Sequence, residues 1–384
     1  MTTRRESLAQ RRAAMGFTQE ALAAALRVSR ITVSRWERGT LTPQPRSRHR
    51  LAQVLKISLE TLDTLLPRSF KAPDAPNGEP FEVPRSIDLV TIADLRQQVQ
   101  QIDELYDRVP STSLLAEAGH VLGHIGFLRG QAATSRAHRD LRELEAEAET
   151  LMGQLVWDAS QRRDHQCARQ HFDKAVQAAQ EIKNAAAAGH ALLRKSYIAL
   201  YGEQDAQSGL ALTRRAADAT SNVSNILTGL ALLHTAEAHA MLGNRRDCEA
   251  ALSQAETQFA TASTYDVAGF LFSSSQFNRM AGSCYLFLGL HQRAQAVLET
   301  TASSMKQRKS RAIVLGNLSL ARLRLGELHG ATDALHEAID VVEQTRGGGG
   351  LNVVFDAGRE LRPWRSEQVV DEVYDRLLSL MTTA

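Results

Sequence analysis

Four arginines and four large apolar residues alternate within the segment RVSRITVSRWERG, residues 27–39 of the 384-residue chain. A guanidinium group keeps its charge at any physiological pH and presents five N–H donors in a planar fork. It therefore binds phosphates, and it can make two parallel hydrogen bonds to the O6 and N7 atoms of guanine. The arginines can do this chemistry only if the apolar residues anchor the segment to a core and leave the charges outside.

A helical interpretation of the segment separates the two kinds of residue. At about 100° per residue, Val33 and Trp36 fall on one face and most of the arginines fall on the other. Ser29 is a suitable N-cap, and Gly39 is a suitable residue to end a helix. We therefore expect a helix over residues 29–38, with Val33 and Trp36 in the core.

Charge is distributed unevenly along the chain. Residues 1–71 contain 14 Lys and Arg against 5 Asp and Glu, a net charge of +9. The remaining residues contain 31 against 38, a net charge of −7. A basic N-terminal part on an acidic body indicates a polyanionic partner for that part.

The flanking segments complete a set of short helices. Thr18 precedes the apolar stretch 19–26, and its hydroxyl group is suited to cap a helix there. Residues 27–29 then form a short turn into the arginine-rich helix. On the inward face of the helix over 19–26 we expect Ala21, Leu22, Ala25 and Leu26. Downstream, apolar residues recur at helical spacing: they are Leu51, Val54, Leu55, Leu59, Leu62 and Leu65.

This arrangement resembles the helix-turn-helix DNA-binding domain of the lambda-repressor/Cro (XRE) family. The stretch TQEALA, the turn RVS, and VSRWERG followed by Pro43 carry the resemblance, which covers residues 4–66. It implies a five-helix domain, assigned to residues 1–66, whose helix over 29–38 enters the major groove of DNA with its N-terminal end first. It also implies an internal salt bridge between Arg12 and Glu37.

The same resemblance implies the DNA contacts. The base-facing positions are those of Arg30, Ile31, Ser34 and Arg35. Thr18, Gln19, Arg48 and Arg50 correspond to phosphate contacts, and Arg46 aligns with a position near the minor groove. The full set of candidate DNA-binding residues is Thr18, Gln19, Arg30, Ile31, Thr32, Ser34, Arg35, Arg38, Arg46, Arg48 and Arg50.

A proline-rich segment separates this domain from the rest of the chain. Residues 67–84 read PRSFKAPDAPNGEPFEVP and have no helical period, so we assign residues 67–87 to a linker. Residues 88–384 show a succession of helical patterns, such as GLALLHTAEAHAML and VLGNLSLARLRL, without strand-like alternation of useful length. The sequence therefore predicts an all-α protein.

A signature recurs in this second domain. An apolar helix ends in Leu-Gly or Tyr-Gly and a short polar turn follows; five positions after three of the glycines stands a small residue, Cys248, Ala294 or Ala331. The glycines are Gly202, Gly243, Gly289 and Gly326, spaced by 41, 46 and 37 residues, a range typical of helix-pair solenoids. The glycine allows a tight turn, and the small residue allows the second helix to approach the first.

The signature resembles that of tetratricopeptide repeats over roughly residues 150–345, which implies a right-handed α-solenoid with a concave surface. An irregular helical bundle is the alternative. We expect the four glycines at 347–350 to end the last repeat flexibly. A helix over 366–381 is expected to cap the solenoid, with pairing to a second copy of the chain as the alternative. Polar candidates for binding an effector on the concave surface are Ser196, Glu237, Gln276, Asn278, Arg279, Ser283, Asn317 and Arg324.

Other kinds of chemistry find little support. His120 and His124 have a metal-capable spacing, but no third ligand is apparent nearby, and the three cysteines form no CxxC pair. No P-loop, HExxH or GxSxG motif occurs. We expect no metal, no cofactor and no enzymatic activity. A signal peptide and an 18-residue apolar stretch are also lacking, so we expect a cytoplasmic protein without a membrane partner.

The combined architecture is similar to that of bacterial regulators that sense peptide pheromones in quorum sensing. By this resemblance we expect a transcriptional regulator that binds operator DNA as a homodimer, with an effector peptide or small molecule in the repeat groove. Two alternatives stay open: an antitoxin-like regulator whose repeat domain binds another protein, and a metal-dependent enzyme with an accessory DNA-binding domain.

Overall fold

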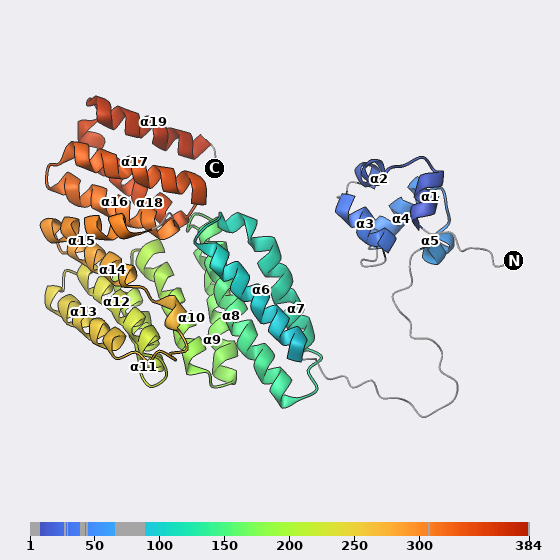
Figure 1. Ribbon diagram of the computed structural model, residues 1–384, viewed down its shortest axis with the longest axis horizontal. Coiled ribbons are helices and arrows are strands. Elements are labelled where there is room, and N and C mark those ends of the chain that lie inside the picture. Colours follow the sequence, from blue (N-terminus) through green and yellow to red (C-terminus); the bar gives the residue numbers. More distant parts are fainter. Residues whose placement is uncertain are drawn as a thin grey trace. The chain divides into compact units, whose positions relative to one another are not determined.

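The protein is described from a computed structural model, which places residues 8–26, 28, 30–38, 43, 45–65, 89–305 and 308–382. The chain divides into two compact units, Met1–Glu82 and Val83–Ala384, here called the head and the body (Figure 1). Every regular element in the described ranges is helical, and no strand occurs in them, as the sequence predicts.

Five short helices form the described part of the head: α1 (Leu8–Ala14), α2 (Gln19–Leu26), α3 (Arg30–Arg38), α4 (Pro45–Val54) and α5 (Leu59–Leu65). Their apolar faces meet in one cluster, in which Leu22, Val33, Leu51, Leu55 and Leu62 are completely buried. α2 packs against α3 and α4, and α1 also contacts α3. The five-helix domain is therefore present, and the linker predicted at 67–87 lies outside the described residues.

The body consists of helices joined mostly by short turns. Its elements are α6 (Leu89–Tyr106), η1 (Ser111–Ser113), α7 (Leu115–Arg129), α8 (Ser135–Ala159), α9 (His165–Glu181), α10 (Ala185–Tyr197), η2 (Ile198–Gly202), α11 (Ala206–Thr220), α12 (Asn225–Met241), α13 (Arg245–Ala260), η3 (Gly269–Leu271), α14 (Ser274–Phe287), α15 (His291–Ser304), α16 (Lys309–Arg324), α17 (Leu328–Thr345), α18 (Gly348–Glu360), η4 (Arg362–Trp364) and α19 (Gln368–Thr382). From α8 to α17 they pack as successive antiparallel pairs, α8 with α9 and so on to α16 with α17.

The repeat signature marks the turns within these pairs. Gly243, Gly289 and Gly326 adopt φ angles of 74°, 73° and 82°, in the left-handed region that favours glycine. Gly202 differs, because it ends the π-helical turn η2 and Gln204 takes the positive φ of 56° instead. The small residues predicted at the pair contacts are completely buried: Cys248, Ala255, Ala294, Ala331 and Ala338.

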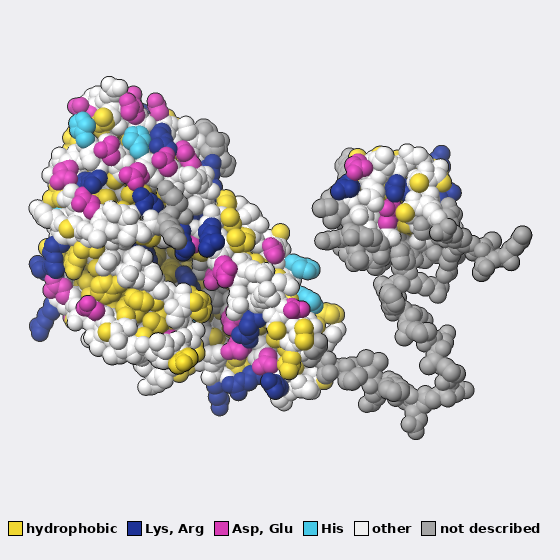
Figure 2. Space-filling model, viewed as in Figure 1, with side chains coloured by type: hydrophobic (Ala, Val, Ile, Leu, Met, Phe, Trp, Pro, Cys, Tyr) yellow, Lys and Arg dark blue, Asp and Glu magenta, His cyan; other side chains and the backbone are white. Residues whose placement is uncertain are grey.

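The first helices of the pairs also pack against one another. Contacts link α8 to α10, α10 to α12, α12 to α14, and α14 to α16. α16 packs closely on α18, and α18 contacts α8. The chain of contacts therefore closes on itself, and we call these helices the inner ring. Figure 2 shows the body hollowed near its middle, with hydrophobic side chains along one wall and Lys and Arg side chains near its border.

The glycine run at 347–350 has a different role from the flexible end that its composition predicts. Residues 348–350 form the first turn of α18, and the whole run is buried. A Cβ atom added to Gly348 would lie 3.1 Å from the carbonyl oxygen of Asp158, and one added to Gly350 would lie 2.6 Å from the Cβ atom of Ala312. The run lacks side chains because α18 packs directly against the end of α8 and against α16.

The last helix, α19, lies where a capping helix belongs. It packs on α17 and α18 and buries Val370, Val373, Leu377 and Leu380 against them. Its bounds differ from the predicted range of 366–381 by one or two residues, which is the usual uncertainty of a helix end.

Candidate DNA-binding helix and inner surface of the body

The arginine-rich helix α3 is fixed to the head by two side chains on its inner face. Val33 is completely buried and Trp36 is 3 % exposed, and both belong to the core cluster of the head. This confirms the predicted core positions of Val33 and Trp36.

A polar lock adds to this anchor and joins three helices. Nε of Arg12 in α1 lies 2.5 Å from Oε1 of Glu37 in α3, and the side-chain amide of Gln19 in α2 donates to Oε2 of Glu37 at 2.7 Å. The hydroxyl group of Thr18 accepts from the backbone N–H of Ala21 at 3.0 Å and so caps α2, as expected. The salt bridge of Arg12 with Glu37 is confirmed, and Gln19 is oriented by the same carboxylate.

Several candidate DNA-binding residues lie on the outer surface of the head. Arg30, in the first turn of α3, is exposed, and its Nε atom lies 3.5 Å from Oε1 of Glu20 in α2. Thr32 and Ser34 are half-buried in α3; in α4, Arg48 is half-buried and Arg50 is exposed. The side chains of Ile31, Arg35, Arg38 and Arg46 lie outside the described residues, as do Ser29 and Gly39.

The residues proposed for effector binding divide into three groups. Ser196 is completely buried, its hydroxyl group donates to the carbonyl oxygen of Leu193, and Asn317 is buried in α16, so neither offers a surface for contact. Arg324 is exposed at the end of α16, and its Nη2 atom lies 2.6 Å from Oε1 of Glu360 in α18. The others lie on α12 and α14 of the inner ring: Glu237, Gln276, Asn278, Arg279 and Ser283.

Glu237 and Ser283 belong to a buried polar network that the sequence did not indicate. The hydroxyl group of Ser283 donates to Oε1 of Glu237 at 2.6 Å, and the hydroxyl group of Tyr201 donates to Oε2. Tyr201 also lies 2.7 Å from Nδ1 of His234, whose Nε2 atom is buried without a hydrogen-bond partner among the described residues. Three inner-ring segments, η2, α12 and α14, are thus joined through one carboxylate.

Burial and these contacts shift the titration of the network. Burial alone would raise the pKa of Glu237, but the contact with His234 and donation from Ser283 and Tyr201 bring it below its ordinary value. Burial lowers the pKa of His234, and burial followed by the nearby Glu237 charge raises the pKa of Tyr201. At neutral pH the network therefore holds an ionised Glu237 and a protonated Tyr201.

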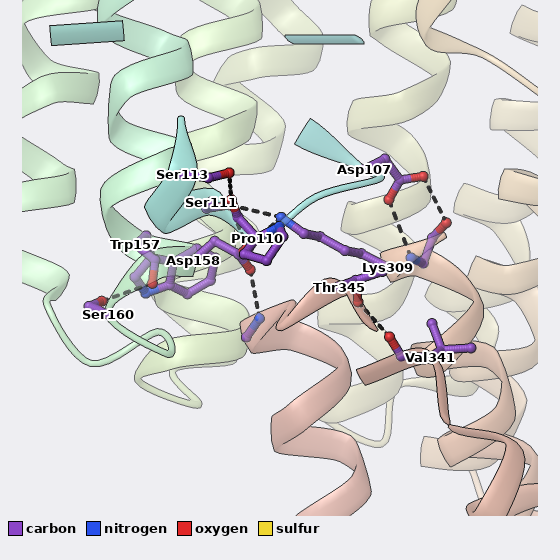
Figure 3. A network of polar contacts seen from close by, with 12 residues as sticks. Asp107, Pro110, Ser111, Ser113, Trp157, Asp158, Ser160, Lys309, Val341 and Thr345 are labelled. Atoms are coloured by element: carbon purple, nitrogen blue, oxygen red, sulfur yellow. Dashed lines mark hydrogen bonds and ion pairs between the residues drawn. The ribbon is translucent and has the colours of Figure 1, made fainter. Parts of the chain in front are cut away.

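A second buried network joins the two ends of the inner ring, and Figure 3 shows it. Nζ of Lys309, at the start of α16, lies 2.9 Å from Oδ2 of Asp158 near the end of α8 and donates to the hydroxyl group of Ser111 at 2.8 Å. That hydroxyl donates to the same carboxylate at 2.7 Å, and the backbone N–H of Gly348 donates to Oδ1 of Asp158 at 2.8 Å. We call this group the clasp, because Asp158 and Gly348 are 190 residues apart in the sequence.

The described residues were also compared with the requirements of a metal site and of a membrane-spanning helix. Within the described ranges, no group of three or more His, Cys, Asp or Glu side chains is arranged to hold a metal ion. His120 and His124 are exposed on α7. None of the described helices combines the length and the apolar character needed to cross a membrane.

Comparison with known proteins identifies the head. A family model described as helix-turn-helix matches residues 8–62, which include α1 to α4 and most of α5. No curated protein matches the chain in sequence. The matched segment is a DNA-binding domain and contains α3 as the second helix of the helix-turn-helix pair.

Solved structures resemble the body. A Rap protein complexed with competence and sporulation factor is 12 % identical, with a TM-score of 0.50, over 76 % of this chain and 77 % of that one. The apo form of the quorum sensor NprR from B. thuringiensis is 13 % identical, with a TM-score of 0.45, over 77 % and 84 %. PlcR from Bacillus thuringiensis, in complex with the peptide PapR7 and DNA, is 13 % identical, with a TM-score of 0.34, over 76 % and 93 %.

At such identities the likeness concerns the fold, and the Rap structure carries it. The chain thus combines an N-terminal helix-turn-helix DNA-binding domain with a tetratricopeptide-like body of paired helices.

Proposed function

We propose that this protein is a sequence-specific transcriptional regulator that binds operator DNA as a homodimer and responds to an effector held by its body. The observation that carries this proposal is the anchoring of α3. Val33 and Trp36 fix the helix to the core, and the lock of Arg12, Gln19 and Glu37 sets its rotation. A helix held in this way presents a constant set of side chains, which reading of base edges requires.

The body supports an effector-binding role for three reasons. Its inner ring surrounds a hollow, and several polar side chains of the ring keep part of their surface accessible. The Rap protein of the same fold was solved with competence and sporulation factor, so a body of this kind can hold a ligand. Gln276, Asn278 and Arg279, in α14 of the inner ring, keep part of their surface accessible and are therefore the favoured contacts for an effector.

Arg35→Ala tests the DNA-binding part of the proposal. If Arg35 reads a base, specific affinity should fall by about 1–3 kcal/mol, while non-specific affinity should change little. Selection of operator sequences from random DNA, followed by fluorescence anisotropy at fixed salt, measures both quantities. Arg139→Ala, which removes an exposed arginine of the body, is the matched control. Unchanged base preference in Arg35→Ala would contradict the assigned role of this residue.

A protein partner is the second candidate for the body. The segment between α13 and α14 exposes three large apolar side chains, Tyr265, Val267 and Phe270, of which Tyr265 is 92 % exposed. Native mass spectrometry of the protein purified from its own host distinguishes the two candidates. A bound species of a few hundred to a few thousand daltons supports an effector, whereas a stoichiometric protein supports the partner-controlled regulator.

A further inference from the structure

Three arginines of the body lie near one pair of tyrosines, and two of them contact the tyrosine rings. Cζ of Arg162, in the turn after α8, lies 4.6 Å from the ring centroid of Trp157 and 5.8 Å from that of Tyr201. Cζ of Arg194 in α10 lies 5.5 Å from the ring of Tyr197, and the two tyrosine rings are 5.6 Å apart. Two guanidinium groups therefore flank one aromatic pair.

Arg279 of α14 completes the group. Burial raises the pKa of Tyr197, and the charges of Arg194, Arg279 and Arg162 oppose this rise. Arg279 also acts on Tyr201. Arg279 also lies one helical turn before Ser283 on α14, and Ser283 and Tyr201 donate to the same carboxylate, that of Glu237. The three arginines therefore come from three segments that meet at this tyrosine pair.

These arginines differ from other arginines of the body in lacking a carboxylate partner. Each has only part of its surface accessible, and none has an Asp or Glu oxygen within 4.0 Å among the described residues. Other arginines of comparable or greater burial do form such pairs: Arg96, Arg129, Arg142, Arg169, Arg311, Arg322 and Arg376. Arg194 has a neutral partner, because its Nε donates to Nε2 of His190 at 3.2 Å. A half-buried cation without a counterion is costly, so three such cations near one another indicate a site for an external anion.

The neighbouring acidic groups do not fill this need. Glu237 already accepts from Tyr201 and Ser283, and Asp103, which acts on Arg194, lies beyond ion-pair distance. Asp107, which Arg279 influences, faces Ser310. Nε of Arg162 is buried and has no hydrogen-bond acceptor among the described residues. One donor of the site is thus oriented and unused.

Arg162 is also held firmly in position. Its guanidinium group stacks on Trp157, and a Cβ atom added to Gly349 would lie 2.1 Å from its Nη2 atom. The backbone of α18 therefore approaches this arginine as closely as a residue without a side chain permits. A guanidinium group oriented in this way loses little conformational freedom when it binds an anion.

We propose that Arg162, Arg194 and Arg279 bind an anionic group, a carboxylate or a phosphate, of the effector, and that Tyr197 and Tyr201 contact the adjoining part of the same molecule. The proposal rests on the effector-binding role of the body and specifies its chemistry. Guanidinium groups match both anions with paired hydrogen bonds. Because Arg162 contacts the first turn of α18, ligand binding there strengthens the closure of the inner ring.

The test uses sodium citrate and sodium pyrophosphate as separate probes for the two anions. Each is titrated into the full-length protein by isothermal titration calorimetry at constant ionic strength, with sodium chloride as the reference. We expect at least one probe to bind, and the double variant Arg194→Gln/Arg279→Gln to weaken its affinity at least tenfold. The control Arg215→Gln/Arg246→Gln removes two exposed arginines of the outer helices α11 and α13 and should bind like the wild type.

The outcomes separate this site from the proposed function. Absence of binding by both probes, or equal loss in the two double variants, overturns the anion site. If the wild-type protein selects no operator sequence from random DNA, the proposed function is overturned instead. The anion titration contains no DNA, so its result does not depend on that outcome. If circular dichroism shows that the double variant is unfolded, Arg194→Gln and Arg279→Gln are measured singly. Each should then weaken binding about threefold or more, and unchanged affinity in both overturns the site.

Discussion

Replacement of Lys309 by methionine tests whether the clasp closes the inner ring. Lys309 is 6 % exposed, and its ammonium group lies 2.9 Å from Asp158 and 4.3 Å from the ring centroid of Tyr106. Methionine keeps the aliphatic chain, which packs over Gly347. The substitution therefore removes the charge with little change of volume and leaves the buried carboxylate of Asp158 without its cation.

The structure sets the expected size of the effect. Removal of one partner of a buried ion pair destabilises a protein by about 3–5 kcal/mol. Asp158 would retain donors from Ser111 at 2.7 Å and Gly348 at 2.8 Å, so we expect the lower end, about 3 kcal/mol. The double variant Asp158→Asn/Lys309→Met removes both charges and should lose only about 1 kcal/mol, since a neutral pair of similar volume often replaces an ion pair at little cost.

Hydrogen–deuterium exchange of the full-length protein measures this effect at the place where it arises. Amides in the first turns of α18 should exchange about 100-fold faster in Lys309→Met, because about 1.4 kcal/mol corresponds to a factor of ten in the opening equilibrium. The control is Lys174→Met, which removes an exposed lysine 3.9 Å from Glu149 and should cost at most about 1 kcal/mol. Equal exchange in the two variants would refute the argument that a buried pair holds the ring closed.

Three further changes examine the head, the glycine turn and the pH dependence. Trp36→Ala should destabilise the head by about 3–5 kcal/mol, because it empties a buried site, and a thermal melt of the head as stable as that of the wild type would contradict the core position of Trp36. Gly348→Ala should cost about 1–3 kcal/mol in urea unfolding, since its Cβ atom would meet the backbone of Asp158 at 3.1 Å; a midpoint equal to that of the wild type would show that the turn can yield. Burial, followed by the charge of Arg194, lowers the pKa of His190 from 6.5 to about 3, so the unfolded chain binds this proton first and stability is lost as the pH falls from about 6.5 toward 3. His190→Gln should therefore remove on the order of 1–2 kcal/mol of the stability difference between pH 7 and pH 5, and an unchanged difference in the urea midpoint would count against a neutral His190.

The head was predictable because its structure depends on short-range rules. The cap at Thr18, the core positions of Val33 and Trp36, and the salt bridge of Arg12 with Glu37 all appear as expected. The error lies in α2, where Ala21 and Ala25 are exposed and Ala23 is buried. Alanine contributes little to a hydrophobic face, so its position follows from the larger leucines and from the packing of neighbouring helices rather than from its own type.

In the body, the sequence predicted the turns within the helix pairs but not the contact of α18 with α8 that closes the inner ring. Gly243, Gly289 and Gly326 have the positive φ angles that their place after a helix requires. The prediction that Ser196 lies on the accessible concave surface is wrong, because its side chain is completely buried. The π-helical turn η2 lies between Ser196 and Gly202, and its extra residue per turn changes the side of α10 that a given distance from the glycine reaches.

The glycine run joins the clasp to the proposed anion site, and this connection has a functional consequence. Gly348 donates to Asp158 of the clasp, and Gly349 packs against Arg162 of the proposed anion site. A ligand that orders Arg162 therefore acts on the same turn that the clasp holds. The expected contribution of the clasp, about 3 kcal/mol, is of the same size as a typical allosteric coupling energy of 1–3 kcal/mol. A ligand that binds the closed ring more tightly therefore adds to the stability that the clasp gives to this closure. If the clasp and the anion site are coupled in this way, Lys309→Met should weaken binding of the anionic probe, although Lys309 itself is not one of the three arginines that hold it.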